Sequence, residues 1–152
     1  MEQYLIGIDA GNTASKVVIF DRYGKNVSTV STPSMRIKRR KPGFEEFDVD
    51  ELWTLIYQCI RQAVERSGIH PEDIKGIGVT SFGNGVVFLG KHGETIGPGC
   101  FSQDYRANGI IKMYKETGVY DRINDIVKGT MWSGGPGPIL RWYKEYERDT
   151  YD

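Results

Sequence analysis

Two short apolar runs near the amino terminus constrain the fold more than any other feature of this sequence. Tyr4–Ile8 and Lys16–Phe20 are rich in isoleucine and valine and short, which favours buried strands. A third run, Val27–Thr32, alternates between apolar and polar residues and ends at Pro33. We predict that the three runs form an antiparallel meander whose first turn is the loop between the first two.

The rest of the chain alternates between helical and strand-like patterns. A helix that follows Asp48 carries one apolar face at helical spacing and stops at Gly68. Because this helix joins the meander to a later strand, the order predicts an α/β fold with a mixed sheet and helices on both faces. The later segments expected are strands at Ile74–Thr80 and Val86–Leu89, a helix at Tyr105–Thr117, an apolar segment from Val119 to Val127, and a last helix near Pro138.

The composition argues against several function classes. The 152 residues carry 20 basic and 20 acidic side chains, without the basic excess typical of nucleic-acid-binding proteins. No apolar run reaches the roughly 18 residues of a membrane-spanning helix, and Glu2 and Asp9 interrupt any signal-like segment. We therefore expect a cytoplasmic protein that binds neither nucleic acid nor membranes. The basic run Arg36–Lys41 fits a solvated loop or a small binding patch.

The stretch DAGNTASK, between the first two runs, carries more chemistry than a turn needs. Gly11 lets the backbone approach a ligand, and successive N–H groups in such turns bind anions. Thr13 and Ser15 add hydroxyl groups and Lys16 adds a positive charge. Asp9 lies at the carboxyl end of a strand, where a carboxylate beside phosphate suits Mg²⁺. The stretch equally fits a polar hairpin loop in which Asp9 caps its own turn.

Two later stretches carry groups suited to a polyol. Gly83 and Asn84 follow an apolar strand directly and could offer backbone and amide groups to hydroxyls, although they also suit a structural turn. Asp104 and Arg106 lie in SQDYRA, where Asp104 also suits a helix N-cap and Arg106 an exposed surface.

Taken together and in this order, these stretches resemble the FGGY family of carbohydrate kinases, which belongs to the actin-like ATPase superfamily with its ribonuclease H-like fold. IGIDAGNTASKVVIFD is similar to the family's opening, a strand, Asp-x-Gly-Thr-x-x-x-Lys/Arg and a second strand. PGFEEFDVDELW is similar to its pre-helix signature, and GIGVTSFGNGVVFLGKHGE to its substrate-side strand pair. SQDYRA resembles its Trp-x-Asp-x-Arg stretch, and ILRWYKEYERDTYD its Trp-bearing helix. The likeness covers essentially the whole chain.

The resemblance implies ATP-dependent phosphorylation of a sugar or polyol hydroxyl, with ATP and Mg²⁺ as cofactors. Phosphoryl transfer depends mainly on positioning and charge neutralisation, which agrees with the polar loop. Asp9 would hold the metal ion. The residues expected to contact phosphate are Gly11, Asn12, Thr13, Ser15 and Lys16. Those expected to line the sugar pocket are Gly83, Asn84, Asp104 and Arg106.

The sequence departs from the family pattern in its motifs and in its length. Asn12 stands where threonine is frequent, Phe82-Gly83-Asn84 replaces Gln-Met-His or Gln-Arg-Glu, and no aromatic residue directly precedes Asp104. The family's general-base aspartate and its adenine-binding lobe lie further along the chain than Asp152. We therefore expect residues 1–152 to be an incomplete amino-terminal domain that lacks the carboxyl-terminal nucleotide-binding lobe, contains no catalytic residue and is inactive alone.

Two other functions stay open at this point. An Asp-x-Gly-Asn-Thr opening also occurs in type III pantothenate kinases, although SQDYRA and the Trp53 helix argue against that class. A non-catalytic nucleotide- or partner-binding module is weakly supported by aromatic residues such as Trp132 and Trp142. Packing of those aromatics against a missing part of the domain explains them better, so we expect self-association through the surface left exposed.

Overall fold

The computed structural model describes residues 2–33 and 37–152, and the chain divides into two compact units. The first unit comprises Met1–Arg36 and Asp50–Phe82, and the second comprises Ile37–Val49 and Gly83–Asp152. No helix in the described ranges is long and apolar enough to cross a membrane. Each unit is described by itself below.

The first unit contains a four-stranded mixed sheet. Its strands are β1 (Tyr4–Ala10), β2 (Ser15–Asp21), β3 (Asn26–Ser31) and β5 (Ile74–Ser81), in the order β3-β2-β1-β5. The pairs β1–β2 and β2–β3 are antiparallel, which confirms the predicted meander. Strand β5 pairs with β1 in parallel and forms one edge of the sheet.

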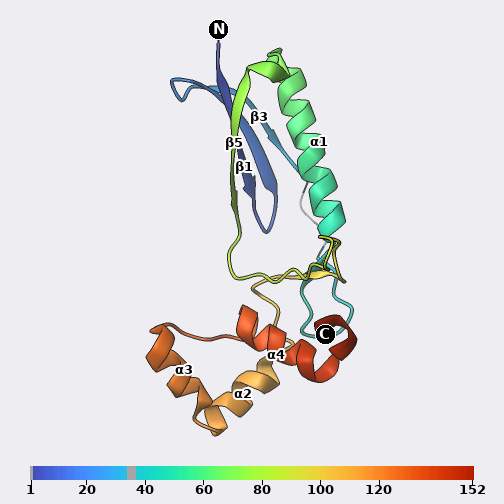
Figure 1. Ribbon diagram of the computed structural model, residues 1–152, viewed down its shortest axis with the longest axis vertical. Helices are drawn as coiled ribbons and strands as arrows, with labels where there is room; N and C mark the ends of the chain where they lie inside the picture. Colours follow the sequence, from blue (N-terminus) through green and yellow to red (C-terminus); the bar gives the residue numbers. More distant parts are fainter. Residues whose placement is uncertain (1, 34–36) are drawn as a thin grey trace. The chain divides into compact units, whose positions relative to one another are not determined.

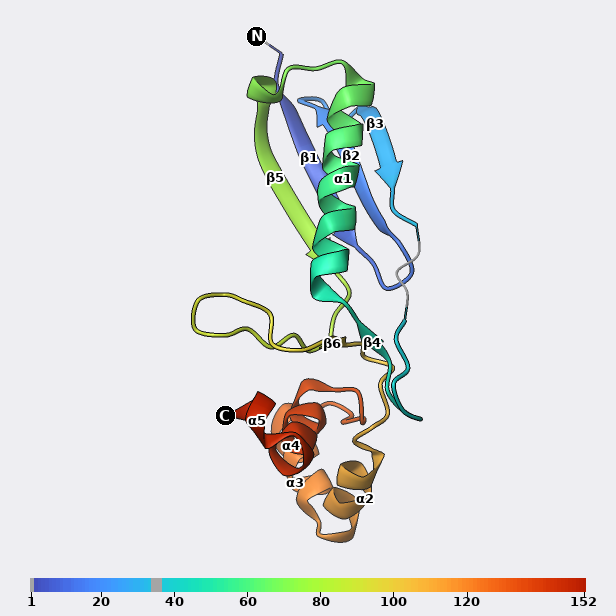
Figure 2. The ribbon, with the colours of Figure 1, turned by 90° about the vertical axis from the view of Figure 1, so that its right-hand side faces the viewer.

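Helix α1 (Val49–Ser67) joins the meander to β5 and lies across one face of the sheet (Figures 1 and 2). Its first turn carries Asp50 and Glu51, which the positive end of the helix dipole stabilises. It ends at Gly68, whose φ of +68° lies in the left-handed region that glycine adopts without steric cost, as the sequence predicted. A 3₁₀ turn, η1 (Pro71–Asp73), then leads into β5.

The core of this unit forms between α1 and every second residue of the meander strands. On the sheet it includes Ile8 and Ile19, and on the helix Cys59 and Ala63, all buried. Apolar residues recur at every second position along the strands and at every third or fourth position along the helix, so each element has one apolar face and the two faces pack together. Cys59 is a free, buried thiol on the apolar helix face.

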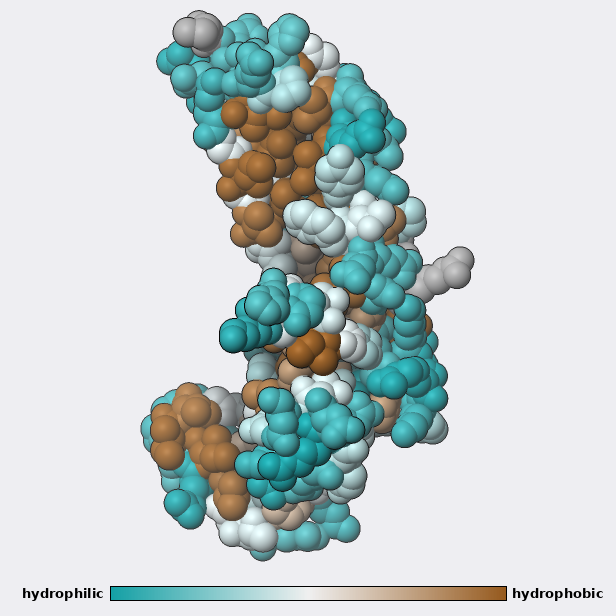
Figure 3. All heavy atoms as spheres, turned by 45° about the vertical axis from the view of Figure 1, so that its right-hand side comes forward, coloured by the Kyte–Doolittle hydropathy of each residue, from teal (hydrophilic) through white to brown (hydrophobic). Residues whose placement is uncertain are grey.

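Within the first unit, no helix covers the other face of the sheet. The expectation of a mixed sheet is confirmed; α1 is the helix of the first unit, and α2 to α5 belong to the second unit. Large apolar side chains in this unit also stay accessible, and Figure 3 shows apolar atoms along its surface. Leu5, Ile77 and Val79 are 50%, 60% and 70% exposed.

The second unit is mostly helical. It contains α2 (Asn108–Glu116), α3 (Val119–Val127), α4 (Pro136–Tyr146) and the short α5 (Arg148–Tyr151), with a two-stranded sheet of β4 (Glu46–Phe47) and β6 (Gly99–Cys100). Its core gathers around Cys100, Ile110, Ile139 and Tyr143.

The predicted strand at Val86–Leu89 is wrong. The segment makes only isolated bridges, Val86 with Cys100 and Leu89 with Thr95, so it runs as a connecting loop. Its apolar residues serve the core directly: Val86 is buried, and Phe88 packs on the ring of Tyr143 with a centroid distance of 4.5 Å. A short apolar run therefore marked burial rather than strand pairing.

The sheet core can be tested with two matched truncations. Ile19→Ala removes a fully buried side chain, and we expect it to lower the free energy of unfolding by about 2–5 kcal/mol. Ile77→Ala makes the same chemical change at a side chain that is 60% exposed, so its cost should stay well below about 1 kcal/mol. Urea unfolding followed by circular dichroism measures both, and equal losses would contradict the assigned core.

Candidate active site

The loop between β1 and β2 is a tight four-residue connection. Ala10 pairs with Ser15 at the end of the ladder, so Gly11 to Ala14 alone make the turn. A Cβ on Gly11 would lie 2.6 Å from the carbonyl oxygen of Ala14. Glycine is therefore required at this position by close backbone approach.

Three polar residues form a row across the strands beside this loop. Asp9 of β1 is registered with Lys16 of β2 on one side and with Thr80 of β5 on the other. All three are exposed and lie on the sheet face that α1 leaves open. Asp9 and Lys16 take part in none of the ion pairs found between described residues. Sequence reasoning did not assign Thr80, which only the parallel register of β5 with β1 places beside Asp9.

This row borders a hollow of about 420 Å³ on the open sheet face. Gly7 and Gly78 lie side by side at its floor; the Phe20 ring lies 3.4 Å from where a Cβ on Gly7 would stand, and nothing lies within 4 Å of the same position on Gly78. Val18 and Phe20 supply apolar walls, whereas Asp9, Lys16 and Thr80 supply the polar end.

The loop itself has the donors that a phosphate group needs. Outside helices and strands, none of the backbone hydrogen bonds between described residues uses the N–H groups of Gly11 to Ala14. The amide oxygen of Asn12 is buried and has no partner in the described structure. Thr13 is exposed on the same turn. The N–H groups and the Thr13 hydroxyl are donors that fit an anion better than a self-satisfied hairpin, in which the loop would cap its own backbone, whereas the Asn12 oxygen is an acceptor and would need a different partner.

The residues beside the loop also fit a hydrated Mg²⁺ ion that is shared with phosphate. Among the described residues no group of three or more His, Cys, Asp or Glu side chains is arranged to hold a metal ion. Mg²⁺ commonly takes one or two carboxylates together with phosphate oxygens and water. The single exposed carboxylate of Asp9 beside free backbone donors matches that donor set.

Ser15 lies differently from the sequence expectation. It shares a face with Val17 and Ile19 and is fully buried on the side covered by α1. Its backbone N–H donates to the hydroxyl oxygen of Thr32 at 2.8 Å, and its own hydroxyl has no partner among the described residues. Its position anchors the loop to β3 and does not present the hydroxyl to solvent, because residues alternate between the two sheet faces.

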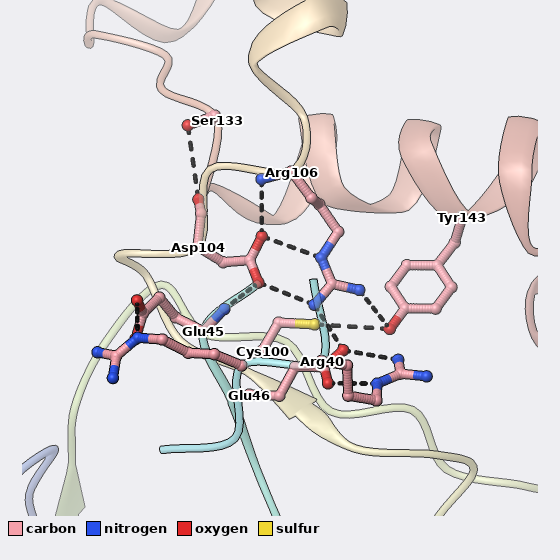
Figure 4. Close-up of polar contacts among 9 residues, drawn as sticks. Arg40, Glu45, Glu46, Cys100, Asp104, Arg106, Ser133 and Tyr143 are labelled. Carbon is pink, nitrogen blue, oxygen red and sulfur yellow. Dashed lines mark hydrogen bonds and ion pairs between the residues drawn. The ribbon is translucent and has the colours of Figure 1, made fainter. Parts of the chain in front are cut away.

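In the second unit, Asp104 and Arg106 form the centre of a buried polar network (Figure 4). Asp104 accepts hydrogen bonds from the backbone N–H of Glu45 and from the backbone and guanidinium of Arg106, at 2.8–3.0 Å. Arg106 also donates to Glu46 at 2.7 Å and to the hydroxyl of Tyr143 at 3.1 Å. Two arginines and two carboxylates thus balance in charge, since Arg40 also pairs with Glu46.

Aromatic rings and burial affect the charged and titratable groups of this network. The guanidinium of Arg106 lies 3.8 Å from the ring centroid of Phe44, within cation–π distance. Burial favours the neutral form of Glu46, but hydrogen bonds from Arg40 and Arg106 outweigh it and hold the pKa of that carboxyl below its usual value. Burial raises the pKa of the Cys100 thiol to about 11, so this cysteine stays protonated at neutral pH.

The network determines what Asp104 and Arg106 can contact. Both side chains are fully buried and their polar groups are engaged within the unit, so in this structure they do not open onto a sugar pocket. The backbone of the same stretch holds the segment before α4. The indole N–H of Trp132 donates to the carbonyl oxygen of Ser102 at 3.0 Å, and the Ser133 hydroxyl donates to that of Asp104 at 3.5 Å. The Trp-x-Asp-x-Arg-like stretch therefore works as a scaffold.

Asn84 lies at the edge of a cavity in the same unit. Its φ of +64° is in the left-handed region, which asparagine adopts more readily than most residues. The cavity measures about 510 Å³ and is bordered by α2, α3 and the first turn of α4. Gly83 precedes it, and a Cβ there would meet no atom within 4 Å.

Acidic partners pair with three of the four described basic residues of the run, Lys41 being the fourth; Arg36 lies outside the described residues. Lys38, Arg39 and Arg40 pair with Asp48, Glu45 and Glu46 at 2.9, 2.6 and 2.6 Å. The pairing supports the solvated-loop interpretation over a basic binding patch.

The chain belongs to the FGGY family of carbohydrate kinases: the sequence model of that family's N-terminal domain matches residues 4–152. A protein of Pasteurella multocida named "Probable L-xylulose kinase" is 38% identical over 97% of this chain and 30% of its own length. The L-xylulose/3-keto-L-gulonate kinase of Escherichia coli is 33% identical over 99% of this chain and 30% of its own length. The chain thus spans less than a third of these curated relatives.

Solved structures of the same kind share the fold. A gluconate kinase from Lactobacillus acidophilus superposes with a TM-score of 0.90 at 25% identity, over 99% of this chain and 30% of that protein. A ligand-bound xylulose kinase from the same organism gives a TM-score of 0.86 at 26% identity, over 98% and 30%. The fold is therefore that of the actin-like sugar kinases, as the sequence predicted.

The close approach at Gly11 predicts a position-specific cost. Gly11→Ala would push a methyl group onto a backbone carbonyl, and we expect a loss of roughly 1–3 kcal/mol in the free energy of unfolding. Gly78→Ala adds the same methyl group where nothing lies within 4 Å, and it should be close to neutral. Urea titrations of the two variants make the comparison, and a neutral Gly11→Ala variant would contradict the tight turn.

The lowered pKa of Glu46 predicts an acid-dependent contribution to stability. The ionised form stabilises fully above the ordinary glutamate pKa of about 4.3, and this stabilisation disappears as the pH falls through the lower folded value. Glu46→Gln should therefore cost roughly 1–3 kcal/mol at pH 7 and less at pH 3. Glu65→Gln, in an exposed pair with Arg61, should cost under about 1 kcal/mol. Urea unfolding of the original chain and both variants at pH 7 and pH 3 measures these costs. If the cost of Glu46→Gln were the same at both pH values, the ionised Glu46 network would be contradicted.

Proposed function

We propose that this chain supplies the acceptor-binding and phosphate-binding part of a kinase that transfers phosphate from ATP to a hydroxyl of a sugar or polyol. The observation that carries the proposal is the row of Asp9, Lys16 and Thr80 beside a loop with free backbone donors. Membership of the FGGY family supports the reaction class.

Asp9 and Lys16 of the row, together with the loop, would position the transferred phosphate. Bound MgATP would supply the phosphoryl group and neutralise its charge. Asp9 would hold the metal ion through its exposed carboxylate. The backbone of Gly11, Asn12 and Thr13, with the Lys16 ammonium, would hold the phosphate oxygens, and Ser15 would fix the loop from its buried side.

The acceptor would bind in the second unit. Gly83 and Asn84 would line its site, where the amide can both donate to and accept from a hydroxyl. Asp104 and Arg106 would act as positioning residues, since they fix the stretch whose backbone holds Trp132 and Ser133.

We propose further that the 152 residues act with a nucleotide-binding lobe that they do not contain, with the general base also lying outside them. The curated relatives are about three times as long as the matched region, which supports this division. The 152 residues alone should then release no ADP in a sugar-dependent way.

A chimera tests the activity directly. This chain replaces the matching part of the Escherichia coli relative, and ADP release is measured with a panel of sugars, polyols and pantothenate. We expect sugar-dependent release, reduced about 100-fold or more by Asp9→Asn because one charge at the transferred group is lost. Asp125→Asn, an exposed aspartate on α3, is the matched control and should leave the rate unchanged.

Three results would contradict the proposal. A chimera that is folded by circular dichroism but releases no ADP with any acceptor would contradict the reaction class. If the Asp9→Asn variant released ADP at an undiminished rate, the assignment of Asp9 as the metal ligand would be wrong. Sugar-dependent turnover by the 152 residues alone would contradict the need for a second lobe.

A further inference from the structure

Strand β5 has a row of backbone groups that face away from β1. The N–H of Phe82, directly after the strand, donates to the carbonyl oxygen of Ala10 in β1 at 3.0 Å. Because successive residues of a strand direct their backbone groups to opposite edges, Ile77 and Val79 direct theirs to the outer edge. In the described part of the chain no strand pairs with that edge. The row is regular over residues 76–81, where the register with β1 is unbroken.

The side chains of this row are apolar and lie beside α1 rather than under it (Figure 2). Ile77 is registered with Ile6 of β1, which is buried against α1. Val79 is registered in the same way with the buried Ile8. Paired residues point to the same face of a sheet, so Ile77 and Val79 extend the apolar layer of the core past the helix. Both are more than half exposed, and they form an uncovered apolar strip on the edge strand.

The opposite edge of the sheet, β3, has a different character. Val30 is buried there, whereas Thr29 and Ser31 expose hydroxyl groups. The register of β3 with β2 shifts beside Asn26, and the Asn26 amide donates to the Thr29 hydroxyl at 2.8 Å. Irregular pairing and polar side chains both oppose the addition of another strand. Of the two edges, β5 is therefore the one suited to further pairing.

The regular part of β5 is complementary to itself in the antiparallel direction. When two copies pair about Gly78, Ile77 of each copy lies opposite Val79 of the other. Both residues direct their backbone groups outward, so each such pair exchanges both of its N–H···O bonds. Gly78 meets its own copy on the two-fold axis, and Thr80 lies opposite Gly76. No two charged side chains face each other, because Lys75 is the one charged residue of the strand.

We propose that β5 is a dimerisation edge, through which two copies of this chain join their four-stranded sheets into one continuous sheet. The partner is a second copy because a two-fold rotation about Gly78 gives every apolar residue of the strip an apolar counterpart. Such an interface uses the same surface of both copies and closes at two. One short strand from each copy is a small contact beside the roughly 1,200 Å² or more of stable interfaces, so the dimer dissociates readily. The proposal does not depend on the kinase activity.

Sedimentation equilibrium of the 152-residue chain, between about 5 and 500 µM, measures the association. We expect a monomer–dimer equilibrium with a Kd on the order of 1–100 µM. Val79→Lys places a charge in the apolar strip and should raise the Kd at least about tenfold. Val27→Lys adds the same charge at an exposed valine of β3 and should change the Kd by less than about twofold. Circular dichroism confirms that both variants are folded.

A pair of opposite charges tests the register. Ile77→Glu alone should weaken association as Val79→Lys does, because each leaves a charge opposite an apolar side chain. When both substitutions are made in one chain, the new carboxylate of each copy lies opposite the new ammonium group of the other. Opposite charges at directly opposed positions stabilise strand pairing, so the Kd should return to within about threefold of the original value.

A disulfide tests the position of the two-fold axis. Residues opposed in a non-hydrogen-bonded antiparallel pair have Cα atoms about 4.5 Å apart, which a disulfide can span. A Cβ at Gly78 meets no atom within 4 Å, so Gly78→Cys should form a disulfide-linked dimer with oxidised glutathione as the oxidant. Thr80→Cys is the matched control, because the two copies of that residue lie about four residues, or roughly 13 Å, apart. The native Cys59 and Cys100 are buried and should contribute little.

Three results would overturn the proposal. The first is a chain that stays monomeric at about 500 µM. The second is an association that persists in the folded Val79→Lys variant but is lost in Val27→Lys, or in Ile126→Lys on the exposed side of α3, since the interface would then lie elsewhere. The third is a folded Gly78→Cys variant that forms no more linked dimer than Thr80→Cys, because that result excludes pairing about Gly78.

Discussion

The buried guanidinium of Arg106 is the interaction on which the second unit depends. It links β4 through Glu46, the segment before α2 through Asp104, and α4 through Tyr143. A cation removed from water needs nearly all of its donors satisfied, and the two carboxylates and one phenol achieve that. Since the unit has only two-residue strands, this network replaces the regular hydrogen-bond ladder that orders the first unit.

The two units thus keep their geometry by different physical means. In the first unit, the pairing of β1 with β2 and β5 places Asp9 between Lys16 and Thr80. Because successive side chains of a strand point to opposite faces of the sheet, these three side chains lie on the face away from the core. In the second, side-chain hydrogen bonds hold irregular segments such as the one carrying Trp132. The position of a functional group on the sheet therefore does not depend on any single side-chain contact. The position of Trp132 in the wall of the cavity beside Asn84, in contrast, depends on a few polar bonds.

Much of the first unit could be predicted from sequence because its signals are local. The alternation of strands, the helix stop at Gly68 and the meander order all follow from short-range patterns. The place of Thr80 could not be predicted, because parallel pairing across residues 11–73 leaves no local signal. The burial of Ser15 could not be predicted for a related reason: its polarity suggests exposure, but the strand register turns it toward α1. The ion pairs that Arg106 forms with Asp104 and Glu46 could not be predicted either, because a charge in a motif does not reveal whether it binds a ligand or another part of the chain.

Strand β5 forms the edge of its sheet, and the backbone groups that face away from β1 have no strand partner in the described part of the chain. Such an edge is a template for another strand, and proteins commonly protect it with charges, bulges or proline. Here Lys75 is the single charged residue in eight, and glycine and apolar residues fill most of the strand. The free backbone groups of β5 can therefore pair with one more strand. That strand can come from the same polypeptide or, where the polypeptide does not supply it, from a neighbouring molecule.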